Sequence, residues 1–169
     1  MFGLLLAGHE TTTNLSANAL LMLLSDLPSW AAICRDPSLI PGAIEEVLRI
    51  ASSVVCWRRR TREVTIVQGV TIPANANVLL ALGSANYDAA LFPEPDRFDI
   101  RRPNAREHVS FGKGTHFCMG ASLARLELKV LLEEIVKRYP QLTLVEGQHL
   151  EYIRTVAFRG PKSLIARLF

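Results

Sequence analysis

Residues 111–120 read Phe-Gly-Lys-Gly-Thr-His-Phe-Cys-Met-Gly and lead directly into a helical pattern. Gly112, Gly114 and Gly120 permit positive φ and close backbone approach, so this loop can lie against a flat ligand. Cys118 stands at or just before the predicted helix N-terminus, where unpaired N–H groups and the helix dipole favour a thiolate. The stretch therefore predicts a metal-binding thiolate. A small buried cysteine is the alternative interpretation.

The pattern after Cys118 predicts an amphipathic helix over about 121–139. One face is apolar and another is charged, with the spacing of a 3.6-residue period. The apolar residues are Leu123, Ala124, Leu128, Leu131, Leu132 and Ile135, and the charged ones are Arg125, Lys129, Glu133 and Lys137. The loop and the helix together form one unit of the fold.

The pattern Phe-Gly-x-Gly-x-His-x-Cys-x-Gly resembles the haem-ligand loop of the cytochrome P450 family. The resemblance implies haem b as the cofactor, with the Cys118 thiolate as the axial ligand to iron. It also implies that Phe111 packs beside the sulfur, that Gly112 and Gly120 approach the haem, and that His116 reaches a propionate.

A second motif, Ala-Gly-His-Glu-Thr-Thr at residues 7–12, interrupts an apolar helical stretch over about 2–27. A buried carboxylate is costly unless it is paired or solvated, so Glu10 either has a special role or lies on an exposed face. The motif resembles the P450 distal-helix sequence. By that resemblance Gly8 leaves room for dioxygen, and Glu10 and Thr11 are catalytic residues that manage its protons.

A third motif, Glu-x-x-Arg, is formed by Glu46 and Arg49 on a helix predicted over about 39–50. As an exposed i, i+3 pair it would contribute only about 0.2–0.5 kcal/mol. In the P450 family this pair is completed by an arginine from a later Pro-x-Arg-Phe segment, which is similar to residues 95–98 here. The resemblance implies a buried cluster of Glu46, Arg49 and Arg97 with a structural role.

Arg59 lies in a basic group with Arg58, Arg60 and Arg62, and such a group is usually a solvated surface. Strand alternation would let one arginine point inward while its neighbours face water. The surrounding region resembles the haem-flanking strand of the P450s, and on that basis Arg59 is the candidate for a propionate contact.

The predicted fold class is mainly α with small β-sheets (α+β), and the order of the segments resembles the C-terminal part of the P450 fold, from the distal helix to the C-terminus. Residues 1–169 are expected to form one partial P450 domain. Its segments are a distal helix at about 2–27, a short helix near 29–35, the Glu-x-x-Arg helix at 39–50, a β region at 54–82 with a hairpin-like turn at 69–73, a meander at 83–110, the ligand loop at 111–120, the proximal helix at 121–139, and C-terminal β segments within 142–168, namely 142–146, 152–158 and 163–168.

Composition and charge exclude several other classes of protein. A net charge of +3 and one short basic run, without a recognition motif, argue against nucleic-acid binding. His9, Glu10 and several Thr and Asn residues break the first apolar run, which argues against a membrane span. That run also lacks the basic flank of a signal peptide. The three scattered cysteines suit a reducing cytoplasm, which is the expected location.

The resemblance implies a haem-thiolate monooxygenase that inserts one atom of dioxygen into a small organic substrate. Electrons would come from a ferredoxin or flavodoxin, attracted by a basic proximal surface that includes Lys113 and Arg125. The segments 51–57 and 156–158 are expected to face the substrate.

Two alternatives remain open. Because the resemblance covers less than half of a P450 and the first helix is apolar on all sides, the chain could be an inactive remnant or a haem-binding module without turnover. A peroxide-using thiolate-haem enzyme is the third possibility, and the retained Glu10 and Thr11 argue against it.

Overall fold

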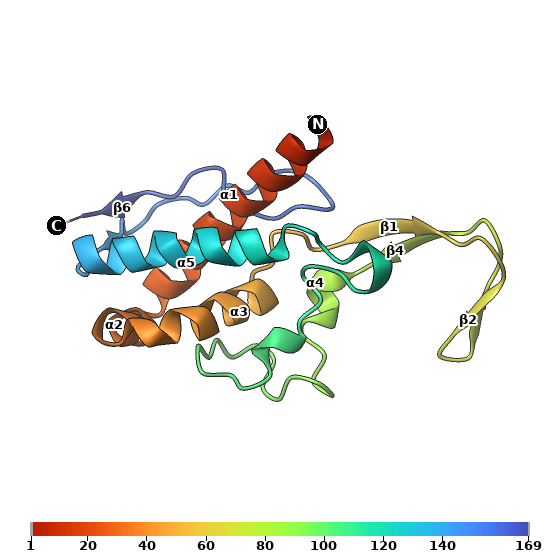
Figure 1. Ribbon diagram of the computed structural model, residues 1–169, viewed down its shortest axis with the longest axis horizontal. Helices are drawn as coiled ribbons and strands as arrows, with labels where there is room; N and C mark the ends of the chain where they lie inside the picture. The colour runs from red at the N-terminus through yellow and green to blue at the C-terminus, as the bar shows by residue number, and fades with distance from the viewer. Residues whose placement is uncertain (1, 169) are drawn as a thin grey trace.

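The computed structural model describes residues 2–168, and four helices supply most of its hydrophobic core. The long helix α1 (Phe2–Ser25) is followed by α2 (Leu27–Arg35), the 3-10 turn η1 (Pro37–Leu39), α3 (Ile40–Ile50) and, much later in the chain, α5 (Ala121–Arg138). In Figure 1, α5 crosses in front of α1, and α2 and α3 lie below them. The N-terminal end of α5 points toward the side of the molecule that carries the β hairpins.

The break between α1 and α2 has a local cause. Asp26 caps α2, because its carboxylate accepts a hydrogen bond from the Ser29 backbone N–H at 3.1 Å. Pro28 occupies the first turn of the new helix, where its missing N–H costs nothing. The first helix was expected to continue to about residue 27. It ends at Ser25, because Asp26 caps the next helix.

The hydrophobic core lies between these helices and takes in only part of α1. The side chains in its centre come from all four helices, and the most deeply buried are Leu15, Ala19, Leu23, Ile33, Ile40, Ala43, Val47, Leu128 and Leu132. Leu4 and Leu5, near the start of α1, remain exposed. The two halves of α1 therefore have different surroundings.

The β structure consists of three separate two-stranded antiparallel sheets. Strands β1 (Trp57–Arg60) and β4 (Asn77–Leu80) pair with Trp57 opposite Leu80 and Arg60 opposite Asn77. Strands β2 (Thr65–Val67) and β3 (Val70–Ile72) form a hairpin, whose turn places Gln68 and Gly69 at positive φ. The third sheet joins β5 (Thr143–Leu144) to β6 (Ala166–Arg167).

A long irregular meander connects β4 to α5. It contains the four-residue helix α4 (Leu82–Ala85) and the 3-10 turns η2 (Ala105–Glu107) and η3 (Gly114–His116). Gly42 on α3 is required where the meander passes, because a Cβ there would lie 2.7 Å from the carbonyl oxygen of Ile100. The meander is thus fitted closely onto α3.

These elements confirm the predicted fold class of helices with small sheets. The expected strand over 152–158 is wrong. Those residues make only isolated bridges, from Tyr152 to Pro161 and from Val54 to Phe158, because Thr155 closes a local turn with the Phe158 main chain.

Among the described residues, no single helix is long and apolar enough to cross a membrane. Residues Gly3–Ser25 and Leu27–Arg35 meet that criterion only as a pair, and the pair is bent by 102°.

Candidate functional site

The loop at 111–120 is held in shape by its own main chain. The Cys118 N–H donates to the Phe111 carbonyl at 3.0 Å, and the Phe117 N–H donates to the Gly114 carbonyl at the same distance. The Cys118 carbonyl accepts from the Ala121 N–H at 3.2 Å, which joins the cysteine to the first residue of α5. Cys118 lies two residues before the helix cap, Gly120, so the predicted position near a helix N-terminus is confirmed.

The three glycines of the loop have different roles. Gly112 and Gly114 have φ values of +71° and +76°, which glycine adopts without strain, and a Cβ on either would meet no atom within 4 Å. Gly120 instead has φ −86°, and a Cβ there would lie 3.9 Å from the Cys118 sulfur. The expected use of positive φ therefore holds for two of the three positions, and a Cβ on Gly120 would only make an ordinary van der Waals contact with the sulfur.

Cys118 is an exposed free thiol, and exposed apolar side chains stand on both sides of it. Phe117 is 51% exposed and Met119 is 87% exposed. His116 is exposed on the same loop. The alternative of a small buried cysteine is therefore wrong for Cys118, because the loop presents the sulfur at the surface.

Phe111 connects the loop to the helices beneath it. Its ring lies 5.8 Å from the His108 ring and 6.3 Å from the Phe117 ring, and the Arg125 guanidinium lies over it at 4.6 Å from the ring centroid. A cation over an aromatic face at this distance is attractive. The Phe111 ring is thus held from several sides, while its carbonyl accepts the Cys118 N–H bond.

Arg125 is fixed in turn by a buried carboxylate. Its Nε and Nη2 atoms donate to the two oxygens of Glu45 at 2.7 and 3.0 Å. His108 Nε2 lies 3.2 Å from Glu45 Oε2, and Arg106 Nε lies 3.7 Å from Glu45 Oε1. Burial of Glu45 raises the pKa of its carboxyl, but the hydrogen bonds from His108 and Arg125 outweigh it and bring the pKa down to about 2.

This pairing corrects the expected role of Arg125. The sequence placed it with Lys113 on a basic surface for an acidic partner, whereas the structure neutralises its charge against Glu45. Lys113 is exposed on the ligand loop. Of the two residues, only Lys113 presents its charge at the surface.

The Glu-x-x-Arg pair lies at the centre of a second, fully buried cluster. Arg49 donates to both oxygens of Glu46, at 2.8 and 2.9 Å, and both side chains have no exposed surface. Arg49 also donates to the main-chain carbonyls of Asn86, Pro95 and Arg97. These bonds fasten the meander to α3.

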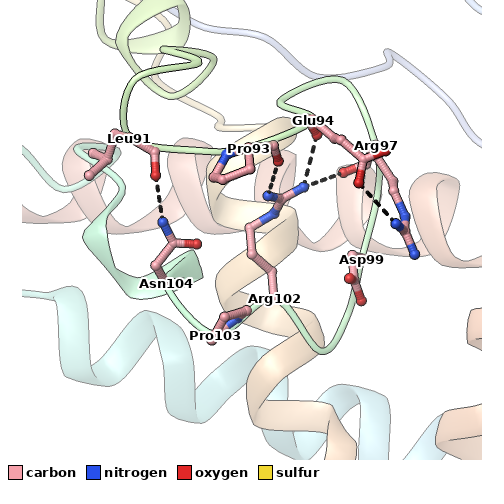
Figure 2. A pocket seen from close by; sticks show the side chains of 8 residues that line it. All are labelled: Leu91, Pro93, Glu94, Arg97, Asp99, Arg102, Pro103 and Asn104. Carbon is pink, nitrogen blue, oxygen red and sulfur yellow. Dashed lines mark hydrogen bonds and ion pairs between the residues drawn. The ribbon is translucent and has the colours of Figure 1, made fainter.

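The arginine that completes this cluster is Arg102, so the prediction of Arg97 is wrong. Arg102 Nε donates to Glu46 Oε1 at 3.1 Å and its side chain is 6% exposed. The Arg97 side chain is 62% exposed and pairs with Glu94, although its carbonyl accepts bonds from Arg49 and Arg102. Figure 2 shows the Arg102 guanidinium reaching toward main-chain carbonyls while the Arg97 side chain extends away from it.

The residues drawn in Figure 2 line a surface pocket of about 430 Å³ within the meander, between Leu91 and Asn104. Its lining includes Arg97 but none of the residues predicted to contact haem or dioxygen, and the Arg102 hydrogen bonds on its wall are those that hold the meander. The pocket is therefore a product of the meander and lies apart from the Cys118 loop.

Strand β1 separates Arg59 from its neighbouring arginines. Trp57 and Arg59 share one face with Leu80 and Val78 of β4, whereas Arg58 and Arg60 lie on the other. All four residues of β1 are exposed, and Val78 opposite Arg59 is half-buried. Arg59 thus belongs to a face that is otherwise apolar, although it is not turned into the interior.

The distal-helix residues lie on the exposed half of α1. Gly8 and Glu10 are exposed, and a Cβ on Gly8 would meet no atom within 4 Å. The Thr11 hydroxyl donates to the Ala7 carbonyl at 2.6 Å, and Thr13 does the same to His9 at 2.8 Å. Such bonds back to the helix tend to bend it. For Glu10, the exposed alternative is the one observed.

The two segments expected to face the substrate are brought together. The Val55 N–H donates to the Ala157 carbonyl at 2.8 Å, the Arg159 N–H donates to the Ser53 carbonyl at 2.9 Å, and the Trp57 and Phe158 rings meet edge to face at 6.3 Å. Cys56 is buried there, with its thiol donating to the Val156 carbonyl at 2.9 Å. Val156 at the tip is 75% exposed.

Several residues of the supporting structure were missed by the sequence reasoning. Glu45 and His108 had no assigned role, although Glu45 is adjacent to Glu46 in the motif itself. Asn18 was also missed, and its amide nitrogen donates to the carbonyls of Ala51 and Arg159 at 2.9 and 3.0 Å. Asn18 thereby ties α1 to segment 51–57 and to the residue that follows segment 156–158. A polar residue within an apolar helix was the available signal.

The Cys118 loop fits a haem group on the chemistry of its donors. It presents an exposed thiol beside a helix N-terminus, two glycines whose Cβ positions are open, and the apolar rings of Phe111 and Phe117. The Trp57, Leu80 and Val78 face with its single arginine suits the edge of a flat apolar group that carries carboxylates. This set defines the class of haem-thiolate proteins.

The chain belongs to the cytochrome P450 family, because the sequence profile described as Cytochrome P450 matches residues 38–162. Haem b with a cysteine thiolate ligand is the cofactor of that family. The comparison confirms the resemblance drawn from the motifs.

Among curated relatives, Cytochrome P450 107B1 of Saccharopolyspora erythraea is 45% identical over 169 residues, covering 99% of this chain and 42% of the relative. Vitamin D(3) 25-hydroxylase of Pseudonocardia autotrophica is 46% identical, covering 93% and 39%. Among solved structures, the P450 heme domain of Tepidiphilus thermophilus matches with a TM-score of 0.94 and 45% identity, covering 98% of this chain and 39% of that one. The chain therefore spans about 40% of the length of these relatives.

Proposed function

We propose that the chain forms the ligand-bearing part of a haem-thiolate monooxygenase, with Cys118 as the axial ligand to iron. The observation that carries the proposal is the exposed Cys118 thiol, on a loop that main-chain bonds join to Phe111 and to the start of α5. Bound haem would supply oxygen activation: with two electrons and two protons, one atom of dioxygen would enter an organic substrate and the other would leave as water.

The remaining loop residues orient the group. Phe111 packs beside the sulfur, and Gly112 and Gly120 let the main chain approach the haem without a side chain in between. His116 and Arg59 hold the two propionates, His116 from the ligand loop and Arg59 from β1. Both side chains are exposed, which suits contacts with carboxylates at the edge of the site.

Helix α1 carries the residues that would make room for dioxygen, bind it and deliver protons to it. They are Gly8, Thr11 and Glu10. Gly8 leaves the space, since no atom lies within 4 Å of the position of its missing Cβ. Thr11 donates its hydroxyl proton to the Ala7 carbonyl, so its oxygen lone pairs are available to accept a hydrogen bond. Glu10 is exposed and can exchange protons with solvent.

The substrate is a small organic molecule that contacts segments 51–57 and 156–158.

The electron donor is a ferredoxin- or flavodoxin-type protein that approaches the ligand-loop side, where Lys113 is exposed. One structural neighbour is an intact type IV self-sufficient P450 monooxygenase, 47% identical with a TM-score of 0.97 over 99% of this chain and 22% of that one. We place the protein in the cytoplasm, without a nucleic-acid or membrane partner.

A second candidate function, haem binding without turnover, is favoured by one observation. Leu4, Leu5 and Glu10 on α1 are exposed, so the side of the site that handles dioxygen has few neighbours within this chain. A haem held only through Cys118 and the loop would bind weakly and would not be protected from water. We therefore expect weak retention of haem and poor solubility for the 169-residue chain.

The test is haem reconstitution of the 169-residue chain, followed by reduction and addition of carbon monoxide. The haem-loaded fraction should show the red-shifted Soret band of a thiolate-ligated haem, and Cys118→Ala should abolish it. Cys34→Ala is the matched control, since that half-buried thiol lies elsewhere and should leave the band intact. An identical band in the Cys118→Ala protein would overturn the assignment. Stable binding at stoichiometric haem would refute the expected weak retention.

A further inference from the structure

The residues Glu45, His108 and Arg125 come from three separate segments and meet under the ligand loop. Glu45 is on α3, His108 follows η2 in the meander, and Arg125 is on the second turn of α5. The side chains of Glu45 and His108 are 4% and 2% exposed, and that of Arg125 is 30% exposed. None of the three touches the Cys118 sulfur directly in the contacts described.

The guanidinium of Arg125 makes two different contacts at once. Its edge donates to both oxygens of Glu45, at 2.7 and 3.0 Å, and its flat face covers the Phe111 ring at 4.6 Å. A carboxylate that holds both donors of the fork also fixes the plane of the guanidinium. The orientation of Glu45 therefore determines where the Phe111 ring can lie.

His108 fixes the orientation of Glu45. His108 Nδ1 accepts the Ser110 backbone N–H at 3.2 Å, which assigns the hydrogen to Nε2, and Nε2 donates to Glu45 Oε2 at 3.2 Å. The Ser110 hydroxyl donates to the Leu48 carbonyl on α3 and accepts from the Asn86 amide at 2.8 Å. One oxygen of the Glu45 carboxylate is thus bound by His108, which is itself held in place by Ser110.

The path from this group to the cysteine is short. The Phe111 carbonyl accepts the Cys118 N–H at 3.0 Å, so any shift of Phe111 moves the backbone that carries the sulfur. The other ion pairs on α5, Lys129 with Glu133 and Arg138 with Glu134, are i, i+4 pairs on its exposed surface. Each also joins a basic side chain to a glutamate, but the contacts of the described residues link neither pair to Phe111.

We propose that Glu45, His108 and Arg125 act as positioning residues for the ligand loop, setting the geometry of Cys118 through Phe111. The proposal rests on the function proposed for Cys118, because only a ligand needs its sulfur held to a fixed direction. It gives Arg125 a role inside the protein, in place of the partner contact expected from its charge.

The first test needs no haem and measures amide hydrogen exchange in the 169-residue chain. Arg125→Gln removes the charge and the stacking face, and Arg138→Gln is the matched control on the same helix. We expect exchange at the Cys118 amide to rise about tenfold in Arg125→Gln, equivalent to about 1.4 kcal/mol of lost local protection. Arg138→Gln should leave it unchanged. Equal exchange in the two variants would overturn the proposal.

Two further variants separate local positioning from general loss of structure. Arg125→Lys keeps the charge toward Glu45 and loses the flat face, whereas Phe111→Leu keeps the ion pair and removes the ring. Both should raise exchange at Cys118 and leave the amides of the buried α5 residues Leu128 and Leu132 protected. Full protection of Cys118 in either variant, or exchange that rises equally along all of α5, would contradict a positioning role.

The second test uses the haem-loaded protein and carbon monoxide. In the Arg125→Lys protein, the fraction of bound haem that lacks a thiolate ligand should be several-fold larger than in the Arg138→Gln protein. If the wild-type chain itself shows no thiolate band, the proposed function fails, while the exchange result still decides whether the network fixes the loop. If wild type and Arg125→Lys show the same share, the network does not position the ligand.

Discussion

The buried charge cluster of Glu46, Arg49 and Arg102, here called the support, differs from the exposed surface around Cys118, here called the face. The difference is how fully the residues of this chain surround each of them. In the support, Glu46 and Arg49 have no exposed surface, and their charges are paired with each other and with Arg102. On the face, Phe117 and Met119 are more than half exposed on either side of the exposed thiol. The support is complete within these residues, whereas the face is open.

The difference has a physical origin in what each region must bury. A buried charge is tolerated only when partners satisfy it, so the support has to be complete wherever it folds. Exposed apolar side chains carry no such local requirement, and at Phe117 and Met119 the cost is only exposed apolar surface. We therefore expect stability to depend on the support and hardly at all on the face. Matched residues from buried and exposed environments should therefore respond differently to substitution.

The largest effect is expected at Arg102 and not at Arg97. Arg102→Ala removes a bond to Glu46 and leaves the carbonyls of Pro93, Glu94 and Arg97 without this donor. Breaking a buried pair of this kind costs about 3–5 kcal/mol. Arg97→Ala removes only an exposed pair with Glu94, and its cost should stay within about 0.5 kcal/mol. Urea denaturation of both variants measures the difference.

This comparison also decides which arginine completes the buried cluster. If Arg97→Ala proved as destabilising as Arg102→Ala, the assignment from the Pro-x-Arg-Phe pattern would be restored. The pattern did identify the correct segment, because the carbonyl of Arg97 accepts bonds from Arg49 and Arg102.

The second comparison uses two leucines of α1. Leu23 is completely buried, so Leu23→Ala leaves a cavity and should cost about 2–5 kcal/mol. Leu5 is 69% exposed, and Leu5→Ala should change the free energy of unfolding by less than about 0.5 kcal/mol. The Leu5 variant should also be more soluble. Equal losses of stability in the two variants would show that the first half of α1 is buried in solution.

A third comparison concerns pH and sets Glu45 against Glu134. The pKa of Glu45 is lowered to about 2 from 4.5, chiefly by hydrogen bonds from His108 and Arg125 that overcome its desolvation. A lowered pKa stabilises the fold fully above the unfolded-state pKa of 4.5, and this contribution is lost as the pH falls from 4.5 toward 2. The loss can reach about 3 kcal/mol.

Denaturation at a series of pH values tests this prediction. The stability gap between the wild type and Glu45→Gln should be constant above about pH 5 and should shrink between pH 4.5 and pH 2. Glu134→Gln, which breaks only an exposed pair with Arg138, should give a small gap. Parallel curves for the wild type and Glu45→Gln would show that Glu45 does not contribute to acid sensitivity.

Much of this architecture was predictable from local sequence signals. The helix at α5 followed from its apolar spacing, and the ligand loop followed from its glycines and cysteine, because the residues that determine these features are neighbours in the chain. The P450 fold class followed from the order of the motifs. These signals need no knowledge of distant contacts.

The errors arose where distant segments meet. Arg97 and Arg102 lie five residues apart on the same irregular meander, and no periodicity says which of them turns toward Glu46. Arg125 looked like one charge on a basic helix face, since its partner Glu45 lies 80 residues away. Long-range pairing of charges is set by the packing of α3 against α5, which the sequence pattern alone does not specify.

The smallest expected effect separates two glycines of the ligand loop itself. Gly112 has φ +71°, and a Cβ there meets no atom within 4 Å, so Gly112→Ala is opposed only by the backbone conformation. That strain costs about 1–2 kcal/mol. Gly120 has φ −86° and an ordinary 3.9 Å contact to the Cys118 sulfur, so Gly120→Ala should be neutral or slightly stabilising. Urea denaturation of both variants measures the two costs, and a larger loss at Gly120 would mean that the loop is held by contact with the sulfur. The opposite result, a loss confined to Gly112, would show that even the open face depends on its backbone conformation.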